Sequence, residues 1–460
     1  MQRVESKVKT TMYMVGFTAA LAGLLFGVDV GVISGALSFL AKDFSLSATQ
    51  QEMVVSSVLV GAVIGSLCAG LVSRRYGRRF AILVSGFIFS LGAVLSAFAV
   101  SYVMLLIVRI FLGLALGVAS FTAPLYLSEV APRQIRGGLI ALYQLMITIG
   151  LFLAFLSDYL FSFTESWRLM LGLPFIPAFI MFVAVLFLPK SPRWLMLTGQ
   201  RDRAMAVLRN IRDERDADAE AKEIIESLQT QGGTVREVIG NKYFRKVVFL
   251  GIVLQLIQQF SGMNTIMYYA PTIFKMAGFV THTGQMWGTV IVGLTNVLTT
   301  IVAILVIDRL GRRPVLFFGS TLMIISMFAL GVLFHHGVHT ATQQNITVGF
   351  LLLFIVGFAI SLGPVIWILC SEIFPLKGRD VGVTFSTAAN WFGNTIVGMT
   401  FLTLLSTLGT AGTFWLYAIF GVISLLIMYF YVPETKHVSL EKIEANLLAG
   451  KSCRELGQPV

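Results

Sequence analysis

Polar side chains gather in one stretch of an apolar segment, residues 255–271, which reads QLIQQFSGMNTIMYYAP. At 3.6 residues per turn, Gln255 and Gln259 share a helical face with Gln258 beside them, and Tyr268 follows Asn264 by one turn. An amide without a partner in hydrocarbon is unfavourable by several kcal/mol, so these groups must face protein, water or a ligand. Uncharged amides beside aromatic rings suit a neutral polyhydroxylated solute, but amides also join packed membrane helices. The stretch alone leaves both interpretations open.

Two ionisable residues lie deep in other apolar segments. Asp29 is the only acid near the middle of a predicted helix, and Arg109 is the only base so placed. Burial favours the neutral form of a carboxyl group, whereas a nearby arginine favours the charged form. A carboxyl group under these opposing influences is suited to carry a proton. The alternative is a static, structural ion pair.

Further amides and rings fall within apolar segments: Phe26, Gln144, Asn296, Trp367, Asn390 and Trp391. Helix packing explains each of them alone. Together they predict one neutral, hydrogen-bonding, ring-lined cavity, which favours a sugar over an ion or a lipid.

The composition indicates that membrane helices position these residues. Of 460 residues, 56% are hydrophobic and only 12% are charged. A spanning helix needs about 20 apolar residues. Windows of that length predict an all-α, multi-pass membrane protein with twelve spans, at 14–39, 53–73, 80–100, 102–124, 138–158, 168–188, 246–270, 287–307, 315–334, 349–371, 383–405 and 412–432.

The distribution of basic residues predicts the orientation. Although the net charge of +11 could suggest nucleic-acid binding, 30 of the 34 lysines and arginines fall in the termini and alternate connections. The positive-inside rule therefore places both termini and the central loop in the cytoplasm. Ala20-Leu21-Ala22 resembles a signal cleavage site faintly, but cleavage there would bisect the first span, so we expect an uncleaved helix. The three scattered cysteines predict no disulfide framework.

The two sets of six spans share an internal repeat. Gly77-Arg78-Arg79 recurs as Gly311-Arg312-Arg313, Glu129 and Arg136 recur as Glu372 and Arg379, and residues 188–192 recur as 432–436. The offsets of 234, 243 and 244 are nearly constant. They predict two pseudo-symmetric six-helix bundles with a binding site at the midplane between them. The expected domains are residues 1–189, a connector with short amphipathic helices at 190–245, residues 246–435 and a cytoplasmic tail at 436–460.

The repeated charged residues lie at the predicted cytoplasmic ends of the spans. They could serve only as topology anchors that bind helix carbonyl groups or lipid phosphates. Their recurrence at matched positions favours a gate, in which salt bridges hold one conformation and break in another. The predicted gate residues are Arg78, Glu129, Arg136, Asp308, Arg312, Glu372 and Arg379.

The sequence predicts neither an enzyme nor a bound metal or organic cofactor. His335, His336 and His339 are close together, but no further ligand set accompanies them. The complete phosphate-binding motif, Gly-x-x-x-x-Gly-Lys-Ser/Thr, does not occur in the sequence, so ATP is not the expected energy source.

A series of motifs in order along the chain resembles the sugar porters of the major facilitator superfamily. They occupy residues 23–35, 124–137, 191–195, 258–264, 308–313, 363–373 and 433–436. The resemblance runs from about Ala20 to about Gly457. Within the family, the chain is most similar to bacterial galactose–proton symporters, with arabinose–proton symporters close behind, and residues 285–296 and 370–380 carry this closer match.

The resemblance implies the major facilitator fold and roles for individual residues. Asp29 would take the coupled proton, and Arg109 would respond to its charge. Gln255 is predicted to pack between helices and is not among the implied sugar contacts. The implied sugar contacts are Gln144, Gln258, Gln259, Asn264, Asn296, Trp367, Asn390 and Trp391, with Phe26, Tyr268 and Gly363 lining the same pocket.

Two positions depart from the family pattern. Arg74 stands where the first basic turn usually has aspartate, so the gate of the first half must differ. Lys190 stands where the family often has glutamate after the sixth span. Neither departure touches the predicted sugar or proton positions.

We therefore expect a bacterial inner-membrane transporter that imports a monosaccharide in symport with a proton by alternating access. A galactose- or glucose-type hexose is the preferred substrate. The expected partners are the sugar, the proton and the lipid bilayer, with no nucleic acid, and the chain is expected to be a monomer. The alternatives are a proton-independent facilitator, a symporter that prefers arabinose or xylose, and a non-transporting sugar receptor, for which the expected long tail or signalling domain is missing.

Overall fold

The computed structural model describes the backbone of residues 2–212, 214–230, 240–375, 378–436, 438 and 440–458, and these ranges contain helices and no strand. The predicted all-helical membrane fold is confirmed. The helices are α1 Gln2–Asp43, α2 Ala48–Tyr76, α3 Arg78–Ala97, α4 Tyr102–Val130, α5 Arg133–Ser162, α6 Trp167–Gly172, α7 Phe175–Leu186, α8 Pro192–Leu197, α9 Arg201–Ile211, α10 Glu214–Thr230, α12 Lys242–Phe260, α13 Met263–Met276, α14 His282–Leu310, α15 Arg312–His336, α16 Ala341–Ile360, α17 Leu362–Ile373, α18 Arg379–Tyr431 and α19 Leu440–Leu448.

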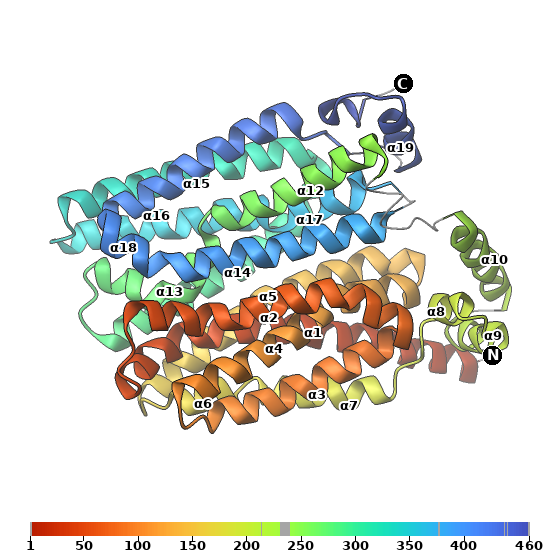
Figure 1. Ribbon diagram of the computed structural model, residues 1–460, viewed down its shortest axis with the longest axis horizontal. Coiled ribbons are helices and arrows are strands. Elements are labelled where there is room, and N and C mark those ends of the chain that lie inside the picture. The colour runs from red at the N-terminus through yellow and green to blue at the C-terminus, as the bar shows by residue number, and fades with distance from the viewer. Residues whose placement is uncertain are drawn as a thin grey trace.

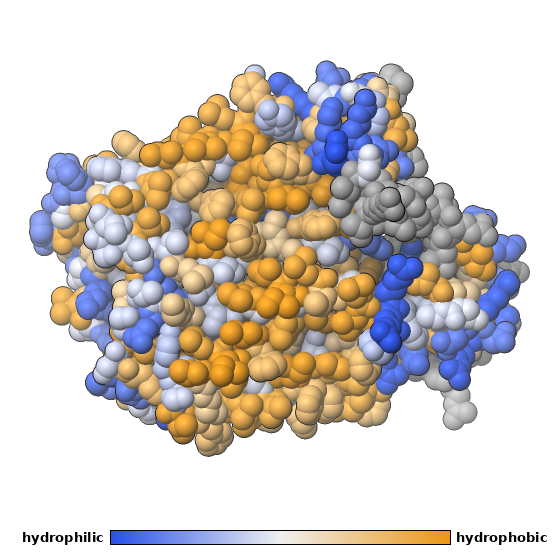
Figure 2. All heavy atoms as spheres, in the orientation of Figure 1, coloured by the Kyte–Doolittle hydropathy of each residue, from blue (hydrophilic) through white to orange (hydrophobic). Residues whose placement is uncertain are grey.

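The long helices run side by side along the long axis of the molecule (Figure 1). Both termini, α8 to α10 and α19 lie at one end, which we call the terminal end; the opposite end is the far end. Figure 2 shows an apolar band across the middle of this face, with hydrophilic residues at both ends. Such a band is expected where lipid tails surround the middle of a protein.

Eleven stretches of the described chain are long and apolar enough to cross a membrane. The eleventh, α18, spans 53 residues and contains the predicted spans 383–405 and 412–432. Gly409 lies between these two spans with φ +72°, and this left-handed conformation breaks the helix. Counted on either side of this break, the stretches correspond to the twelve predicted spans. The first helix is longer than predicted, because a helix can continue beyond its apolar portion.

The helices form two groups, α1 to α7 and α12 to α18, drawn as the lower and upper parts of Figure 1. Across the groups, α2 packs on α18, α5 on α14, and α1 on α13. Between them along the chain, α9 buries Ala204, Leu208 and Ile211, as its amphipathic pattern predicts.

Glycines bring helices within each group into close contact. Gly23, Gly27, Gly31 and Gly35 of α1 all face α5, and a Cβ added to Gly27 would overlap the carbonyl oxygen of Ile147. On α2 and α4, Gly61 and Gly113 meet in the same way. Small residues at this spacing let membrane helices pack backbone to backbone. The α1–α5 pair therefore holds Asp29 in a closely packed part of the first group.

Candidate functional site

The amide-rich stretch lies at a break between two half-helices. Helix α12 ends at Phe260, and α13 begins at Met263 after Gly262, whose φ of +88° favours glycine. A second break separates α16 from α17 at Ser361, with φ −121° and ψ −92°. The predicted spans 246–270 and 349–371 are present, and each consists of two half-helices joined at a break. Hydropathy reports that a segment is apolar, and it does not report whether the helix is interrupted.

Gln258 joins the two breaks. Its Nε2 donates to the carbonyl oxygens of Leu362, at 2.7 Å, and Gly363, at 3.0 Å. Its Oε1 accepts from Asn390 Nδ2 at 2.7 Å and from Gln259 Nε2 at 3.5 Å. One side chain on α12 thus fixes the start of α17 and the position of an amide on α18.

The other amides extend this network in two directions. Gln255 is fully buried, accepts from Asn390 Nδ2 at 2.6 Å and donates to Cys370 Sγ at 3.6 Å. It holds helices together, in line with its interpretation as packing. In the other direction, Asn264 Nδ2 donates to Gln259 Oε1 at 2.5 Å, and Asn264 is only half-buried. Gln259 and Asn264 therefore form the more accessible edge of the network.

Aromatic side chains connect this network to the first group of helices. The rings of Phe26 on α1 and Trp391 on α18 lie 5.2 Å apart at 41°. Trp391 is buried, and its Nε1 has no hydrogen-bond partner among the described residues, so a donor is available here. Trp367 is 37% exposed although Ile366 beside it is completely buried. Rings with these properties could cover a sugar and donate to one of its hydroxyl groups.

Gln144 and Asn296 lie on α5 and α14, which form one of the helix pairs that pack across the groups. Gln144 is half-buried and Asn296 is buried. In the part of the chain that the structure describes, neither side chain is hydrogen-bonded to the amides around Gln258.

Asp29 and Arg109 are buried, with 2% and 1% of their surfaces exposed. They interact electrostatically, but Arg109 Nε donates to the carbonyl oxygen of Val54 at 3.0 Å. Asp29 Oδ2 and Arg109 Nη2 are both buried without a hydrogen-bond partner among the described residues. A closed ion pair, the structural alternative to a proton carrier, is therefore not formed in this conformation.

Tyr268 lies between the charged residues and the amides. It interacts electrostatically with Asp29 and Arg109, and its hydroxyl group donates to Asn394 Oδ1 at 3.1 Å. The sequence analysis did not identify Asn394. An asparagine one helical turn after Asn390 was the only available signal.

The repeated charged residues form matching clusters at the terminal end. Arg78 Nη2 lies 2.8 Å from Glu129 Oε1, and Ser191 Oγ donates to Glu129 Oε2 at 2.6 Å. These contacts all lie within the first half of the chain. The serine belongs to the third repeated motif, residues 188–192, none of which is among the predicted gate residues.

The second half repeats this arrangement. Arg312 Nη2 lies 2.9 Å from Glu372 Oε1, and Thr435 Oγ1 donates to Glu372 Oε2 at 2.5 Å. Arg379 Nη2 donates to the carbonyl oxygen of Phe374 at 3.5 Å. The side chains of the predicted gate residues Arg136 and Asp308 lie outside the described residues.

The departure at Lys190 removes a helix cap from the first half. At the matching position, Glu434 accepts from the backbone N–H groups of Arg312 at 3.1 Å and Arg313 at 2.9 Å, the first residues of α15. A lysine cannot accept these bonds, and the N-cap residue of α3, Gly77, makes no side-chain cap hydrogen bond. Lys190 Nζ instead lies 5.6 Å from the centre of the Trp194 ring.

We expect Lys190→Glu to stabilise the protein by about 1 kcal/mol, because a carboxylate would cap α3 as Glu434 caps α15. The measurement is the thermal unfolding of the detergent-solubilised protein. Lys190→Gln is the matched control, since it removes the lysine charge without supplying a carboxylate. Equal melting temperatures for the two variants would show that capping is not the cause.

Contacts between the halves gather at the far end. Glu52 on α2 is buried and accepts from the backbone N–H group of Thr403 at 2.8 Å and from Thr403 Oγ1 at 2.7 Å. Ser38 Oγ lies 3.1 Å from His282 Nε2. Glu52 was not among the predicted site residues, because an acid just before an apolar run is typical of a span boundary.

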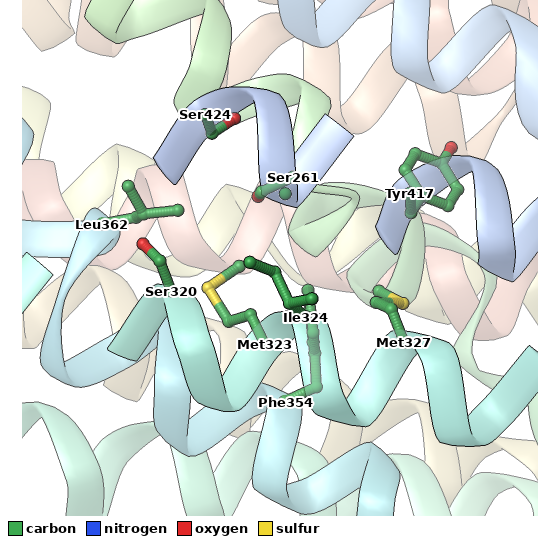
Figure 3. A pocket seen from close by; sticks show the side chains of 10 residues that line it. Ser261, Ser320, Met323, Ile324, Met327, Phe354, Leu362, Tyr417 and Ser424 are labelled. Atoms are coloured by element: carbon green, nitrogen blue, oxygen red, sulfur yellow. The ribbon is translucent and has the colours of Figure 1, made fainter. Parts of the chain in front are cut away.

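A small cavity lies behind the helix breaks, within the second half (Figure 3). Ser261 and Leu362 flank the two breaks, and Met323 and Met327 on α15 line the same space. It has room for about one water molecule, so it cannot hold a sugar.

The chain matches a family model described as "Sugar (and other) transporter" over residues 15–447. It is 52% identical over 450 residues to the galactose-proton symporter of Escherichia coli (strain K12), covering 98% of this chain and 97% of that protein. It is 49% identical over 448 residues to the arabinose-proton symporter of the same strain, covering 96% and 95%. A partially occluded inward-open structure of the xylose transporter XylE from E. coli matches with a TM-score of 0.83 and 30% identity, covering 94% of this chain and 100% of that one.

Proposed function

Since the chain belongs to the sugar transporter family of the major facilitator superfamily, we propose that it carries a monosaccharide and a proton together across the bacterial inner membrane. The preferred substrate is a galactose- or glucose-type hexose. The observation that carries this proposal is a set of uncharged amides and aromatic rings at two helix breaks in one half. This set is joined to the half that contains the buried carboxyl group Asp29 by the Phe26–Trp391 ring contact and by the interaction of Tyr268 with Asp29.

The amides divide into supporting and sugar-binding groups. The Gln258 amide already bonds to backbone carbonyl oxygens and to Asn390, so it fixes the geometry of the half-helices. Gln259, Asn264 and the free Nε1 of Trp391 are then the groups available to sugar hydroxyls. Buried hydrogen bonds to hydroxyl groups give strong discrimination among sugars, because an absent or misdirected hydroxyl leaves a protein group unpaired.

Asp29 carries the proton in this proposal. Neutral Asp29 suits the buried environment, and the ionised form would draw the unpaired Nη2 of Arg109 towards it. Tyr268 interacts with both side chains and bonds to α18 through Asn394, so it connects the proton site to the sugar site. In this proposal the proton is the coupling ion and no cofactor is needed. The chain works as a monomer.

Alternating access follows from the division into two halves. The Arg78–Glu129 and Arg312–Glu372 clusters brace the terminal ends of separate halves, whereas the Glu52–Thr403 bonds join the far ends. Opening the far end must break the Glu52–Thr403 bonds. By the positive-inside rule, the terminal end faces the cytoplasm and the far end faces outwards.

The experiment is to record the external pH of lightly buffered, de-energised cells or vesicles after galactose is added. Symport makes the medium more alkaline, because each sugar that enters takes a proton with it. Sugar entry without a pH change would replace symport by facilitated transport.

The substrate preference is tested by the competition of glucose, arabinose and xylose with the uptake of labelled galactose. Stronger competition by a pentose than by unlabelled galactose would contradict the preference for a hexose.

A further inference from the structure

Asp158 is a buried carboxyl group that the proposed transport mechanism does not use. It lies near the far end of α5 with 1% of its surface exposed. Its Oδ2 accepts from the backbone N–H group of Gly35 at 2.9 Å, and its Oδ1 is buried with no hydrogen-bond partner among the described residues. A Cβ added to Gly35 would lie 2.5 Å from the carboxyl group, so the glycine permits this contact.

At the far end, the charged groups described on α1 and α6, which pack against α5, have other partners. On α1, Lys42 pairs with Glu165 at 3.0 Å, and Asp43 accepts from Trp167 Nε1 at 2.6 Å. Arg168 of α6 donates to the carbonyl oxygens of Ala97 and Ala99, both at 3.0 Å.

Further titratable groups on α14, α1 and α4 make other contacts. His282 of α14 contacts Ser38 and stacks on Phe39. Asp29 of α1 and Arg109 of α4 interact with each other, and among the described residues no charged side chain acts on Asp158. An ionised carboxylate with one donor and no cation is strongly unfavourable in such a place, so Asp158 is neutral in this conformation.

The opposite half supplies the cover over this part of α5. Phe155, one turn before Tyr159, packs on α14, where a Cβ added to Gly293 would lie 2.9 Å from it. Tyr159, adjacent to Asp158, has its ring 5.2 Å from that of Trp287. Separation of the halves at the far end would remove α14 and admit water beside Asp158. The environment of this carboxyl group therefore differs between the two conformations of an alternating-access cycle.

We propose that Asp158 is a second proton-binding residue of the cycle, which takes a proton from water on the far side before the far end closes. The proton bonds to one carboxylate oxygen before closure and returns to water on the same side on reopening. Asp158 therefore sets the pH dependence of closure, and the number of protons carried per sugar does not change. This inference rests on the alternating access of the proposed function.

The first test compares galactose exchange by the wild type and Asp158→Asn in vesicles over a range of external pH. The asparagine keeps an acceptor for the Gly35 N–H group and cannot ionise. As the pH rises, the wild-type carboxyl group must regain a proton before each closure, whereas the variant need not. The ratio of the wild-type rate to the variant rate should fall by up to about tenfold per pH unit. A ratio that stays constant across the pH range would overturn the proposal, even where galactose-driven proton uptake is intact.

The second test does not depend on transport. Infrared spectra of the purified protein at neutral pH should contain a carbonyl band from a buried protonated carboxyl group that Asp158→Asn lacks. Should that variant fail to fold, Gly35→Ala disturbs the same hydrogen bond and should shift the band. If Asp158→Asn removes only a band from an ionised carboxylate and no band from a protonated carboxyl group, the proposal is overturned.

Discussion

Asp29→Asn is expected to abolish the accumulation of galactose against its gradient, while sugar exchange continues. Movement of one charge through 100 mV is worth about 2.3 kcal/mol, and about 1.4 kcal/mol is a factor of ten, so one proton per sugar supports roughly a 50-fold concentration ratio. Asparagine has the shape of a protonated aspartate and cannot release a proton. The variant therefore resembles a permanently loaded carrier, whose final concentration ratio should fall to one.

The structure makes this test specific to Asp29. Its Oδ2 has no hydrogen-bond partner among the described residues, so the substitution breaks no bond at that atom. The measurements are labelled galactose at steady state in energised cells and galactose exchange in de-energised vesicles. Asp202→Asn is the matched control, because Asp202 is an exposed acid on the connector helix α9. Persistent accumulation in the Asp29 variant would mean that another group carries the proton.

The fold could be predicted to a large extent because its main determinants are local or repeated. Apolar length gives the spans, and the matched motifs around Arg78 and Arg312 divide the chain into halves. The contacts Arg78–Glu129 and Arg312–Glu372 follow from that repeat. The helix breaks at Gly262 and Ser361 could not be found in this way, because both interrupt segments that remain apolar.

The site was harder to predict where function depends on contacts between distant segments. Glu52 meets Thr403 although 351 residues separate them, and Asp158 meets Gly35 across 123 residues. Neither acid stands out in hydropathy, since each lies close to the end of a predicted span. The residue types around Gln258 indicated the chemistry, but its main partners are backbone carbonyl oxygens, which no sequence motif displays.

Gln258→Ala is expected to weaken sugar binding by about 10- to 100-fold, or roughly 1 to 3 kcal/mol. The substitution removes the donor to two carbonyl oxygens at the start of α17 and one of the two acceptors of Asn390. The loss therefore includes the disturbed geometry at the break as well as any direct bond to the sugar. The measurement is the dissociation constant of galactose for the purified protein.

Gln255→Ala is the matched control, since Gln255 lies on the same helix and also accepts from Asn390 but contacts α17 only at Cys370, away from the break. If the break between α16 and α17 must be held in place for binding, the Gln258 variant should lose much more affinity than the Gln255 variant. Equal losses would assign the effect to Asn390 alone. An unchanged dissociation constant for Gln258→Ala would return this residue to helix packing, and would leave Gln259, Asn264 and Trp391 as the groups to test for sugar binding.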